Sequence, residues 1–485
     1  MKPTHSPLRT AVQLTIALLL ASACEAAPIP AGSSSGASRS PVGSAHSGKG
    51  SPDADLDRYV ANDGSDANGG SAADPWATLQ HAADAAEAGV TVHVADGVYA
   101  GFTIHRSGTG NAPIVFAAAA AAEPLIEDPG RDFLIHVDGA TDIILSGLHV
   151  RGATEQDGAG IFIGPDSARI TVRHTHVADN RSFGVLIEDS QDVLVQGSDI
   201  SGSASGIRTR GDVAGTLVMA NDIHDNDQMV VNDPEPNNDT GGQGVAISLS
   251  SGPITIRANR IWGNRAESID YGRDGSAFEI FGASDVLITE NVVWDNETIM
   301  ETGTNRTSDC VNIKFTRNIA FGDTSWGESK GILLRCARDS LVAHNTLVGI
   351  EEWGLQFRNR PETGFGGSIE NLTVVNNLVS ADVGILVLDP MPASVTVDFN
   401  LFDADVGVLA RISGTTVTRL EELRSLIGFQ ESGRHARLDL VDPVAGDFRL
   451  LPSSPAIDAG VRLDGVNDEY AAAAPDIGRH ESGQS

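Results

Sequence analysis

Between about residues 140 and 405, apolar and polar positions repeat in one order along the chain. An alternating apolar stretch is followed by a small polar residue or Asn and then by a second short apolar stretch, as in ITIRANRIWGN and LTVVNNLVSAD. Aligned on the polar position, the series runs Thr175, Ser198, Asn221, Asn259, Asn291, Asn318, Asn345, Asn377 and Asn400. The shortest spacing in this series is 23 residues. That period is too short for a pair of helices and predicts a coil of three short strands.

The apolar stretches alternate with a period of two and are rich in β-branched residues, which is typical of strands. Stacked coils of this kind bury one apolar interior, and each coil pairs its backbone with the next. We expect the recurring Asn residues to bond to one another, because an unpaired buried amide costs about 1–3 kcal/mol. The sequence therefore predicts an all-β protein, folded as a single-stranded right-handed parallel β-helix. The alternative, an antiparallel sandwich, needs a hairpin turn after every second strand, and the pattern lacks those turns.

The first strand of each coil begins with a small or apolar residue, and its third position should point outward. This outward column is predicted to contain Phe162, Leu186, Arg208, Ala246, Glu279, Glu301, Leu333 and Gln356. Two positions further along, a second outward column is predicted to contain Gly164, Glu188, Arg210, Ser248, Phe281, Gly303, Arg335 and Arg358. Glu279 and Glu301 should therefore lie side by side on one outer face.

Insertions into the regular coil gather around these two glutamates. Residues 227–243 and 265–276 precede the first strand of their coils, whereas two further insertions, at about 303–310 and 359–367, follow it. Loops along both edges of one face predict a groove, and loops on a rigid scaffold often carry binding groups. By this register Asp270, Tyr271 and Asp274 overhang the groove as candidates for an acid/base, a ring-stacking surface or part of a calcium shell.

Two carboxylates on adjacent strands, roughly 4.8 Å apart, repel each other unless a proton, a cation or neighbouring arginines offset the charge.

Asp233 and Asp239 in the longer insertion are candidate calcium ligands. Arg208, Arg210, Arg335 and Arg358 are candidate substrate-binding cations, with Gln356 and Tyr271 beside them. Carboxyls about 5–5.5 Å apart match retaining glycoside hydrolysis, and repulsion would raise one pKa as a general acid requires. The alternative is two outward polar residues without a task.

Composition and targeting signals narrow the setting of this fold. The 485 residues carry a net charge of −32, which argues against nucleic-acid binding. Lys2 and Arg9 precede a short apolar stretch and the lipobox-like LASAC, which predicts an export signal at 1–24 with lipidation of Cys24, or plain secretion. Membrane contact is expected only through that lipid. Residues 25–55 are rich in Ser, Gly and Pro and are predicted to be a flexible linker. The protein is expected to be a monomer.

Cys310 and Cys336 are the remaining cysteines, and the repeat register places them at nearly the same point of adjacent coils. In an exported protein this arrangement predicts a disulfide, with two buried thiols as the alternative.

The segment RYVANDGSDANGGSAADPWATLQHAADAAEAGVTVHVADGVYAG resembles the amino-terminal cap of secreted β-helix proteins in the pectate-lyase-like superfamily, with a cap helix around Ala77–Glu87. The endings GDFRLLPSSPAIDAG and PDIGRHE resemble those of its polysaccharide-acting members. The resemblance covers roughly residues 57–481 and implies a cap with the first coils at 56–135, repeats at 136–405 and a carboxy-terminal cap and tail at 406–485. The superfamily contains lyases, hydrolases, epimerases and non-enzymes, so the resemblance implies a fold more than a reaction.

Three functions follow as expectations. The first is an exported enzyme that hydrolyses a polysaccharide or oligosaccharide through Glu279 and Glu301, with Asp274 or Asp270 as acid/base. The second is a polysaccharide lyase or uronate epimerase that uses an arginine and calcium, because Lys314 and Lys330 are the lysines near the site and neither falls in the outward column. The third is a non-catalytic module that binds glycan or extends the cell envelope.

Overall fold

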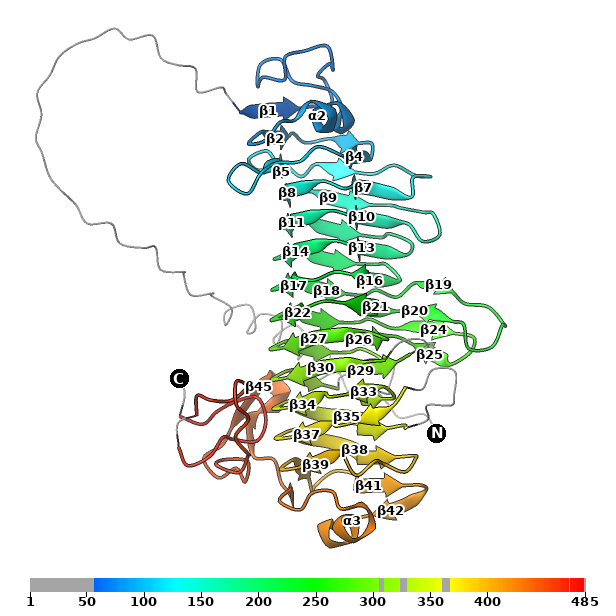
Figure 1. Cartoon of the computed structure of the whole chain (residues 1–485), viewed down its shortest axis with the longest axis vertical. Coiled ribbons are helices and arrows are strands. Elements are labelled where there is room, and N and C mark those ends of the chain that lie inside the picture. The colour runs from blue at the N-terminus through cyan, green and yellow to red at the C-terminus, as the bar shows by residue number, and fades with distance from the viewer. Residues whose placement is uncertain (1–55, 305–308, 323–328, 360–366, 471, 484–485) are drawn as a thin grey trace, which may run out of the picture.

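The computed structural model describes residues 56–304, 309–322, 329–359, 367–470 and 472–483, and these form a right-handed parallel β-helix (Figure 1). The predicted signal peptide, the linker and Cys24 lie outside the described residues. Each coil contributes up to three strands, which pair in parallel with the strands of the coils above and below. The fold predicted from the 23-residue period is therefore confirmed.

The first row of strands carries the outward column. It consists of β4 (Phe102–Ile104), β7 (Phe133–Val137), β10 (Ala159–Ile163), β13 (Phe183–Glu188), β16 (Ser205–Asp212), β21 (Gln243–Ser251), β26 (Ser276–Phe281), β29 (Thr298–Gly303), β32 (Lys330–Leu334), the later parts of β35 (Thr346–Phe357) and β38 (Leu378–Val387), and β41 (Val408–Ile412).

The second row follows the first around each coil and forms a sheet of its own. It consists of β1 (Asp57–Val60), β2 (Thr91–Val94), β5 (Ile114–Ala118), β8 (Thr141–Ser146), β11 (Ala168–Arg173), β14 (Gln191–Gln196), β17 (Thr216–Met219), β22 (Ile254–Arg257), β27 (Ser284–Thr289), β30 (Val311–Thr316), β34 (Leu341–Ala343), β37 (Thr373–Val375) and β39 (Thr396–Asp398), with β33 (Ala337–Arg338) and β36 (Ile369–Glu370) beside its later strands.

The third row closes the coil. It consists of β3 (Val98–Tyr99), β6 (Leu125–Ile126), β9 (His149–Arg151), β12 (His176–Ala178), β15 (Asp199–Ser201), β18 (Asp222–His224), β23 (Arg260–Trp262), β28 (Val292–Trp294), β31 (Ile319–Phe321), the earlier parts of β35 and β38, β40 (Leu401–Asp403) and β43 (Arg434–Ala436). Because β35 and β38 continue around the corner, they join the third row to the first in one sheet.

The interior is a continuous stack of aliphatic side chains with a few aromatic rings, and most of these residues are fully buried. The predicted polar ladder runs along one corner of this stack. Asn221 Nδ2 donates to Asn259 Oδ1 at 3.0 Å, and the same bond repeats from coil to coil through Asn377 and Asn400. Each amide thus finds the partner that its burial requires.

A second ladder, which the sequence analysis missed, lies at the next corner. Asn226 Nδ2 donates to Asn264 Oδ1 and Asn264 Nδ2 donates to Asn296 Oδ1, both at 2.8 Å. The signal was present, since each of these asparagines follows its third-row strand by the same short interval. The two ladders fix two of the three corners of the central coils.

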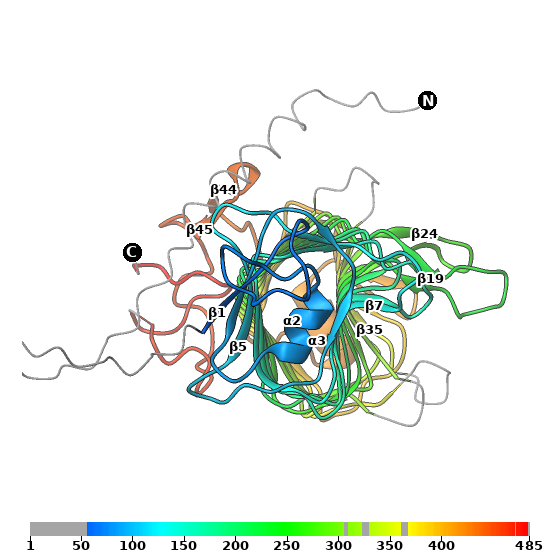
Figure 2. The ribbon, with the colours of Figure 1, turned by 90° about the horizontal axis from the view of Figure 1, so that it is seen from above.

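Both ends of the interior are covered (Figure 2). Helix α2 (Leu79–Ala85) lies within the predicted cap helix and buries Leu79, Ala82 and Ala83 over the first coils. At the other end, α3 (Leu420–Ile427) buries Leu423 in the same core, and β42 (Thr415–Val417) forms a hairpin with β41. No helix in the described ranges is long and apolar enough to cross a membrane.

The tail folds back against the outside of the β-helix. It carries the hairpin of β44 (Leu440–Asp442) and β45 (Asp447–Leu450), with a short 3-10 turn (Pro443–Ala445) between them. Phe448 packs against Phe321, and His344 Nδ1 lies 3.2 Å from the Gly478 carbonyl oxygen. Cys310 and Cys336 form a disulfide with Cα atoms 5.3 Å apart, which ties two adjacent coils beside the first row.

Candidate functional site

The pairing of the first row places the two glutamates as the alternation predicts. Ala246 pairs with Glu279, Glu279 with Glu301 and Glu301 with Leu333 in unbroken register. Phe278 and Ile280 point into the core, so Glu279 between them points outward. Glu279 and Glu301 are both partly exposed, as the prediction of a shared outer face requires.

Two of the insertions form hairpins that project from this face, visible on the right of Figure 1. One consists of β19 (Met229–Val231) and β20 (Thr240–Gly241), and the other of β24 (Ala266–Ser268) and β25 (Gly272–Asp274). Each returns to the first row through a glycine with positive φ, Gly242 or Gly275. A Cβ on Gly275 would lie 2.7 Å from the Gly242 carbonyl oxygen, so only glycine allows the hairpin bases to approach this closely.

Between the hairpins and the strands lies a pocket of about 820 Å³. Of the residues predicted for the site, the pocket is lined by Glu279, Glu301, Asp274, Tyr271, Arg208, Arg335, Arg358, Gln356 and Asp239. The lining does not include Asp270, Asp233 or Arg210. Arg210 instead lies over the Phe183 ring, 5.2 Å from its centroid, and 3.8 Å from the Glu188 carboxylate.

Three of the carboxyls that line the pocket, Asp274, Glu279 and Glu301, have different surroundings. Arg335 forms an ion pair of 2.6 Å with Glu301 and so compensates its charge. Glu279 accepts a hydrogen bond from Gln243, but burial and the neighbouring Glu301 raise the pKa of Glu279. Burial, with Glu279 and Glu301 nearby, raises the pKa of Asp274 to about 8. Of these three, Glu301 is therefore an ion-paired carboxylate, whereas Asp274 and Glu279 resist ionisation.

Arg208 stands at the amino-terminal side of this pocket. Its Nη2 donates to Ser248 Oγ at 3.1 Å, while its buried Nε has no hydrogen-bond partner among the described residues. Burial lowers the pKa of Arg208, against the attraction of Glu279. Among the predicted arginines, Arg208 and Arg335 thus both face the carboxyls.

The expectation of calcium at Asp233 and Asp239 is not supported. Asp239 Oδ1 accepts the Asp233 N–H at 3.0 Å, and its Oδ2 accepts Ser268 Oγ and the Asp270 N–H at 2.7 and 2.9 Å. Asp270 Oδ2 in turn accepts the N–H groups of Asn238 and Asp239. These carboxylates brace one hairpin against the other, and across the described ranges no group of three or more His, Cys, Asp or Glu side chains is arranged to hold a metal ion. The Asp270 carboxylate thus takes part in these hairpin contacts and does not line the pocket, where an acid/base would have to lie.

A family model for the right-handed β-helix region of Pel9A-like proteins matches residues 58–353. The chain belongs to this Pel9A-like β-helix family. The Bacillus subtilis (strain 168) protein YwoF, described as uncharacterized, is 23% identical over 443 residues, which cover 82% of this chain and 91% of YwoF.

Two solved structures are similar to this chain. Pectate lyase Pel9A is 18% identical with a TM-score of 0.48, and the match covers 88% of this chain and 96% of Pel9A. XylC, solved in a complex with xylose, is 10% identical with a TM-score of 0.54, and the match covers 79% of this chain and 86% of XylC. At these identities the likeness concerns the fold alone.

In this Pel9A-like protein the pocket lining includes residues that the sequence analysis did not assign to the site, among them Gln243, Glu297 and Trp353. It also includes Lys330, which the sequence analysis placed near the site but outside the outward column. Lys330 Nζ bonds Glu297 Oε1 at 2.6 Å, and although burial opposes it, this bond raises the pKa of Lys330. Glu297, Lys330 and Trp353 precede or begin their first-row stretches, where strict alternation does not yet fix side-chain direction. The other lysine considered, Lys314, is exposed on β30 in the second row.

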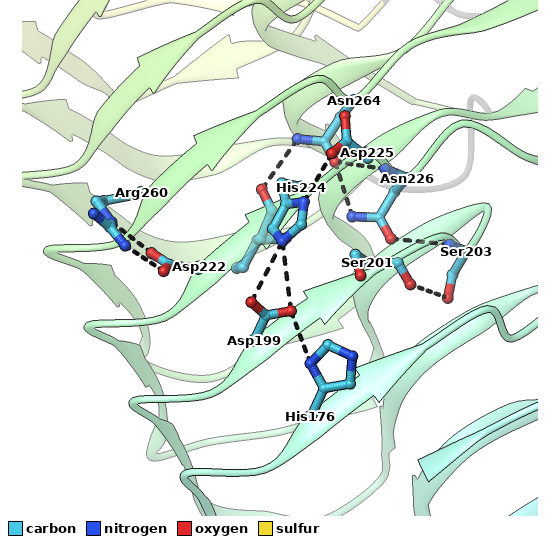
Figure 3. A network of polar contacts seen from close by, with 11 residues as sticks. His176, Asp199, Ser201, Ser203, Asp222, His224, Asp225, Asn226, Arg260 and Asn264 are labelled. Carbon is cyan, nitrogen blue, oxygen red and sulfur yellow. Dashed lines mark hydrogen bonds and ion pairs between the residues drawn. The ribbon is translucent and has the colours of Figure 1, made fainter. Parts of the chain in front are cut away.

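A separate polar network lies on the third row of the Pel9A-like β-helix (Figure 3). His176 Nδ1 and His224 Nε2 approach the Asp199 carboxylate at 3.1 and 3.4 Å, and His224 Nδ1 bonds Asp225 at 2.9 Å. Beyond it, the His224 ring stacks on Trp262 with centroids 4.3 Å apart, and Trp262 stacks on Trp294 at 4.8 Å. The faces of these indoles are thus occupied by neighbouring rings, which disfavours a role in stacking on sugar.

Proposed function

We propose that this protein hydrolyses glycosidic bonds in a polysaccharide or oligosaccharide. The observation that carries the proposal is the convergence of Asp274, Glu279 and Glu301 in one pocket, with Arg335 paired to Glu301 alone. Glycoside hydrolysis requires one carboxyl that holds a proton and one that is charged, on the two sides of the scissile bond.

In this proposal Asp274 is the general acid. It lies at the base of the β24–β25 hairpin, near Glu279 and Glu301 on the first-row strands, and retains its proton up to about pH 8. It gives that proton to the glycosidic oxygen as the bond to the anomeric carbon breaks. Glu301, held by Arg335, either attacks the anomeric carbon, giving a glycosyl-enzyme that water hydrolyses while Asp274 takes the proton of that water, or activates a water that attacks directly. Burial and the nearby Glu279 keep the pKa of Asp274 high.

Elimination is the second candidate, and Arg208 is the observation that favours it. Burial lowers the pKa of Arg208, and its Nε has no hydrogen-bond partner among the described residues. A base for elimination must be neutral when it takes the proton. Lys330 does not meet this requirement, because its bond to Glu297 raises its pKa.

One experiment separates the two reactions. The purified protein is incubated with a panel of neutral and uronate-containing polysaccharides, and new reducing ends and unsaturated-uronate absorbance are followed together. Hydrolysis yields reducing ends without absorbance, whereas elimination yields both. The hydrolase proposal expects kcat/KM to fall as pH rises through about 8. The residual activity of Asp274→Asn should no longer show this fall. Reducing ends accompanied by equal absorbance would reject it.

The location and assembly state are also proposals. The export signal and the lipobox-like Cys24 support a lipoprotein on the cell surface or in the periplasm, or a secreted protein, and we propose a monomer that meets the membrane only through its lipid. Labelling with a radioactive fatty acid, compared between the native chain and Cys24→Ser, tests the anchor. Equal labelling of both chains would reject it.

A further inference from the structure

The carboxy-terminal side of the pocket contains a polar pair that the proposed chemistry does not use. Glu297 is only 3% exposed, yet it lines the pocket. Its Oε1 bonds Lys330 Nζ at 2.6 Å, while its buried Oε2 has no hydrogen-bond partner among the described residues. A buried acceptor without a partner costs about 1–3 kcal/mol, so a ligand hydroxyl that donates to this oxygen removes a penalty.

An apolar surface adjoins this pair. Trp353 and Leu333 are each only 6% exposed and pack together in a cluster outside the core, but both line the same pocket. Lys330 and Trp353 are side by side, because each lies two residues before the paired Ile332 and Leu355. Leu333 in turn pairs with Glu301. The apolar surface therefore begins one strand from the proposed reacting carboxylate.

We infer that Glu297, Lys330 and Trp353 form a subsite for a neutral pyranose ring. A carboxylate oxygen accepts and an ammonium donates, so the pair matches two adjacent ring hydroxyls of which one donates and the next accepts. The part of the Trp353 side chain that lines the pocket is apolar and can contact the C–H face of a sugar. The inference deepens the proposed function and rests on its glycan substrate, but not on the hydrolytic step.

Charge decides against a uronate at this position. Glu297 and Glu352 lie within 4.0 Å of Lys330, so two carboxylates surround one ammonium. A uronate carboxylate also cannot donate to the unpartnered Glu297 Oε2, whereas a hydroxyl can. The substrate is thus a glycan in which the sugar bound by Glu297, Lys330 and Trp353 is neutral and carries free adjacent hydroxyls.

Binding tests the subsite without relying on turnover. The full chain carrying Glu301→Gln is titrated by calorimetry with neutral xylose, glucose, galactose and mannose tetrasaccharides and with galacturonate and mannuronate tetrasaccharides. At least one neutral member is expected to bind, and Glu297→Gln should weaken it about 10-fold, the effect of losing a charged hydrogen bond. Trp353→Phe should weaken it less, and the exposed Glu267→Gln, outside the pocket, is the matched control.

A coupling measurement sharpens the result. Removing one ring hydroxyl from the bound sugar should reduce affinity more for the native pocket than for Glu297→Gln, because the neutral amide oxygen of the variant accepts that bond more weakly than the carboxylate. Equal binding by Glu297→Gln at unchanged melting temperature, binding by uronate tetrasaccharides alone, or no binding by any tetrasaccharide would overturn the subsite. Binding of a neutral tetrasaccharide that the native protein does not cleave would instead sustain the subsite and reject the hydrolase proposal.

Discussion

Two clusters of ionisable groups on the same β-helix have opposite electrostatic character. In the third-row network of Figure 3, hydrogen bonds from His176 and His224 lower the pKa of Asp199 well below its usual range. Although burial opposes it, the bonds to Asp199 and Asp225 raise the pKa of His224 to about 9. Each charge there has a partner, so the charged state is the favoured one.

In the pocket, burial and repulsion between neighbouring carboxyls disfavour the charged forms of Asp274 and Glu279. Burial and the neighbouring glutamates raise the pKa of Asp274 to about 8, and burial with Glu301 nearby also raises the pKa of Glu279. A protein gains no stability from such crowding, whereas acid/base chemistry needs a carboxyl that keeps its proton near neutral pH. The two clusters therefore differ in the direction of their carboxyl pKa shifts, although both are rich in charged residues.

The largest expected effect separates the two clusters by activity. Glu301→Gln should lower kcat on any cleaved glycan by about 10³-fold, within the range for removing a group that takes part in bond cleavage. Asp199→Asn, on another face, should leave kcat within about two-fold. The comparison between clusters fails if Asp199→Asn abolishes cleavage, or if Glu301→Gln retains it with the native melting temperature.

The next effect is a gain of stability from Asp274→Asn. Because the folded-state pKa lies above the ordinary 3.8, ionisation opposes folding increasingly as pH rises from about 4 to 8. The variant should therefore be more stable than the native protein at pH 9, by an amount on the order of 2 kcal/mol, and the difference should vanish near pH 4. Denaturant unfolding at both pH values measures this, and a variant that is less stable at pH 9 would contradict it.

Asp199→Asn should have the opposite sign and a smaller size. The lowered pKa of Asp199 stabilises the fold above about pH 4, and the raised pKa of His224 does so fully below 6.5 and no longer above about 9. The loss should be greatest at pH 5–6, at about 1 kcal/mol after solvent screening, because the Asp199 side chain is 43% exposed. A loss that grows above pH 9 would show that another interaction is responsible.

The smallest expected effect concerns metal. Asp239 already accepts three hydrogen bonds within and between the hairpins, so calcium has no free carboxylate pair at Asp233 and Asp239. Addition of a chelator followed by excess calcium should change the melting temperature by less than about 1 °C, whereas a structural ion would raise it increasingly as the calcium concentration exceeds the dissociation constant. A calcium-dependent rise of several degrees would reinstate the site.

The sequence predicted the parts of this molecule that a strict period controls. The 23-residue repeat gives the β-helix, the alternation in the first row places Glu279 beside Glu301, and the recurring Asn gives one ladder. Hairpin residues obey no such period: Asp270 was expected over the groove, but two backbone N–H groups hold its carboxylate elsewhere. Glu297 and Lys330 lie where a strand begins, so their direction depends on each other rather than on alternation.

The most direct test of the central claim, that three mutually repelling carboxyls share one pocket, is a carbon-13 NMR titration of the Asp and Glu carboxyls. Asp274 is expected to titrate near pH 8 in the native chain, and Glu301→Gln should shift the midpoints of both Asp274 and Glu279 downward by removing a nearby negative charge. A midpoint for Asp274 near its ordinary value of 3.8, unchanged by Glu301→Gln, would contradict the account.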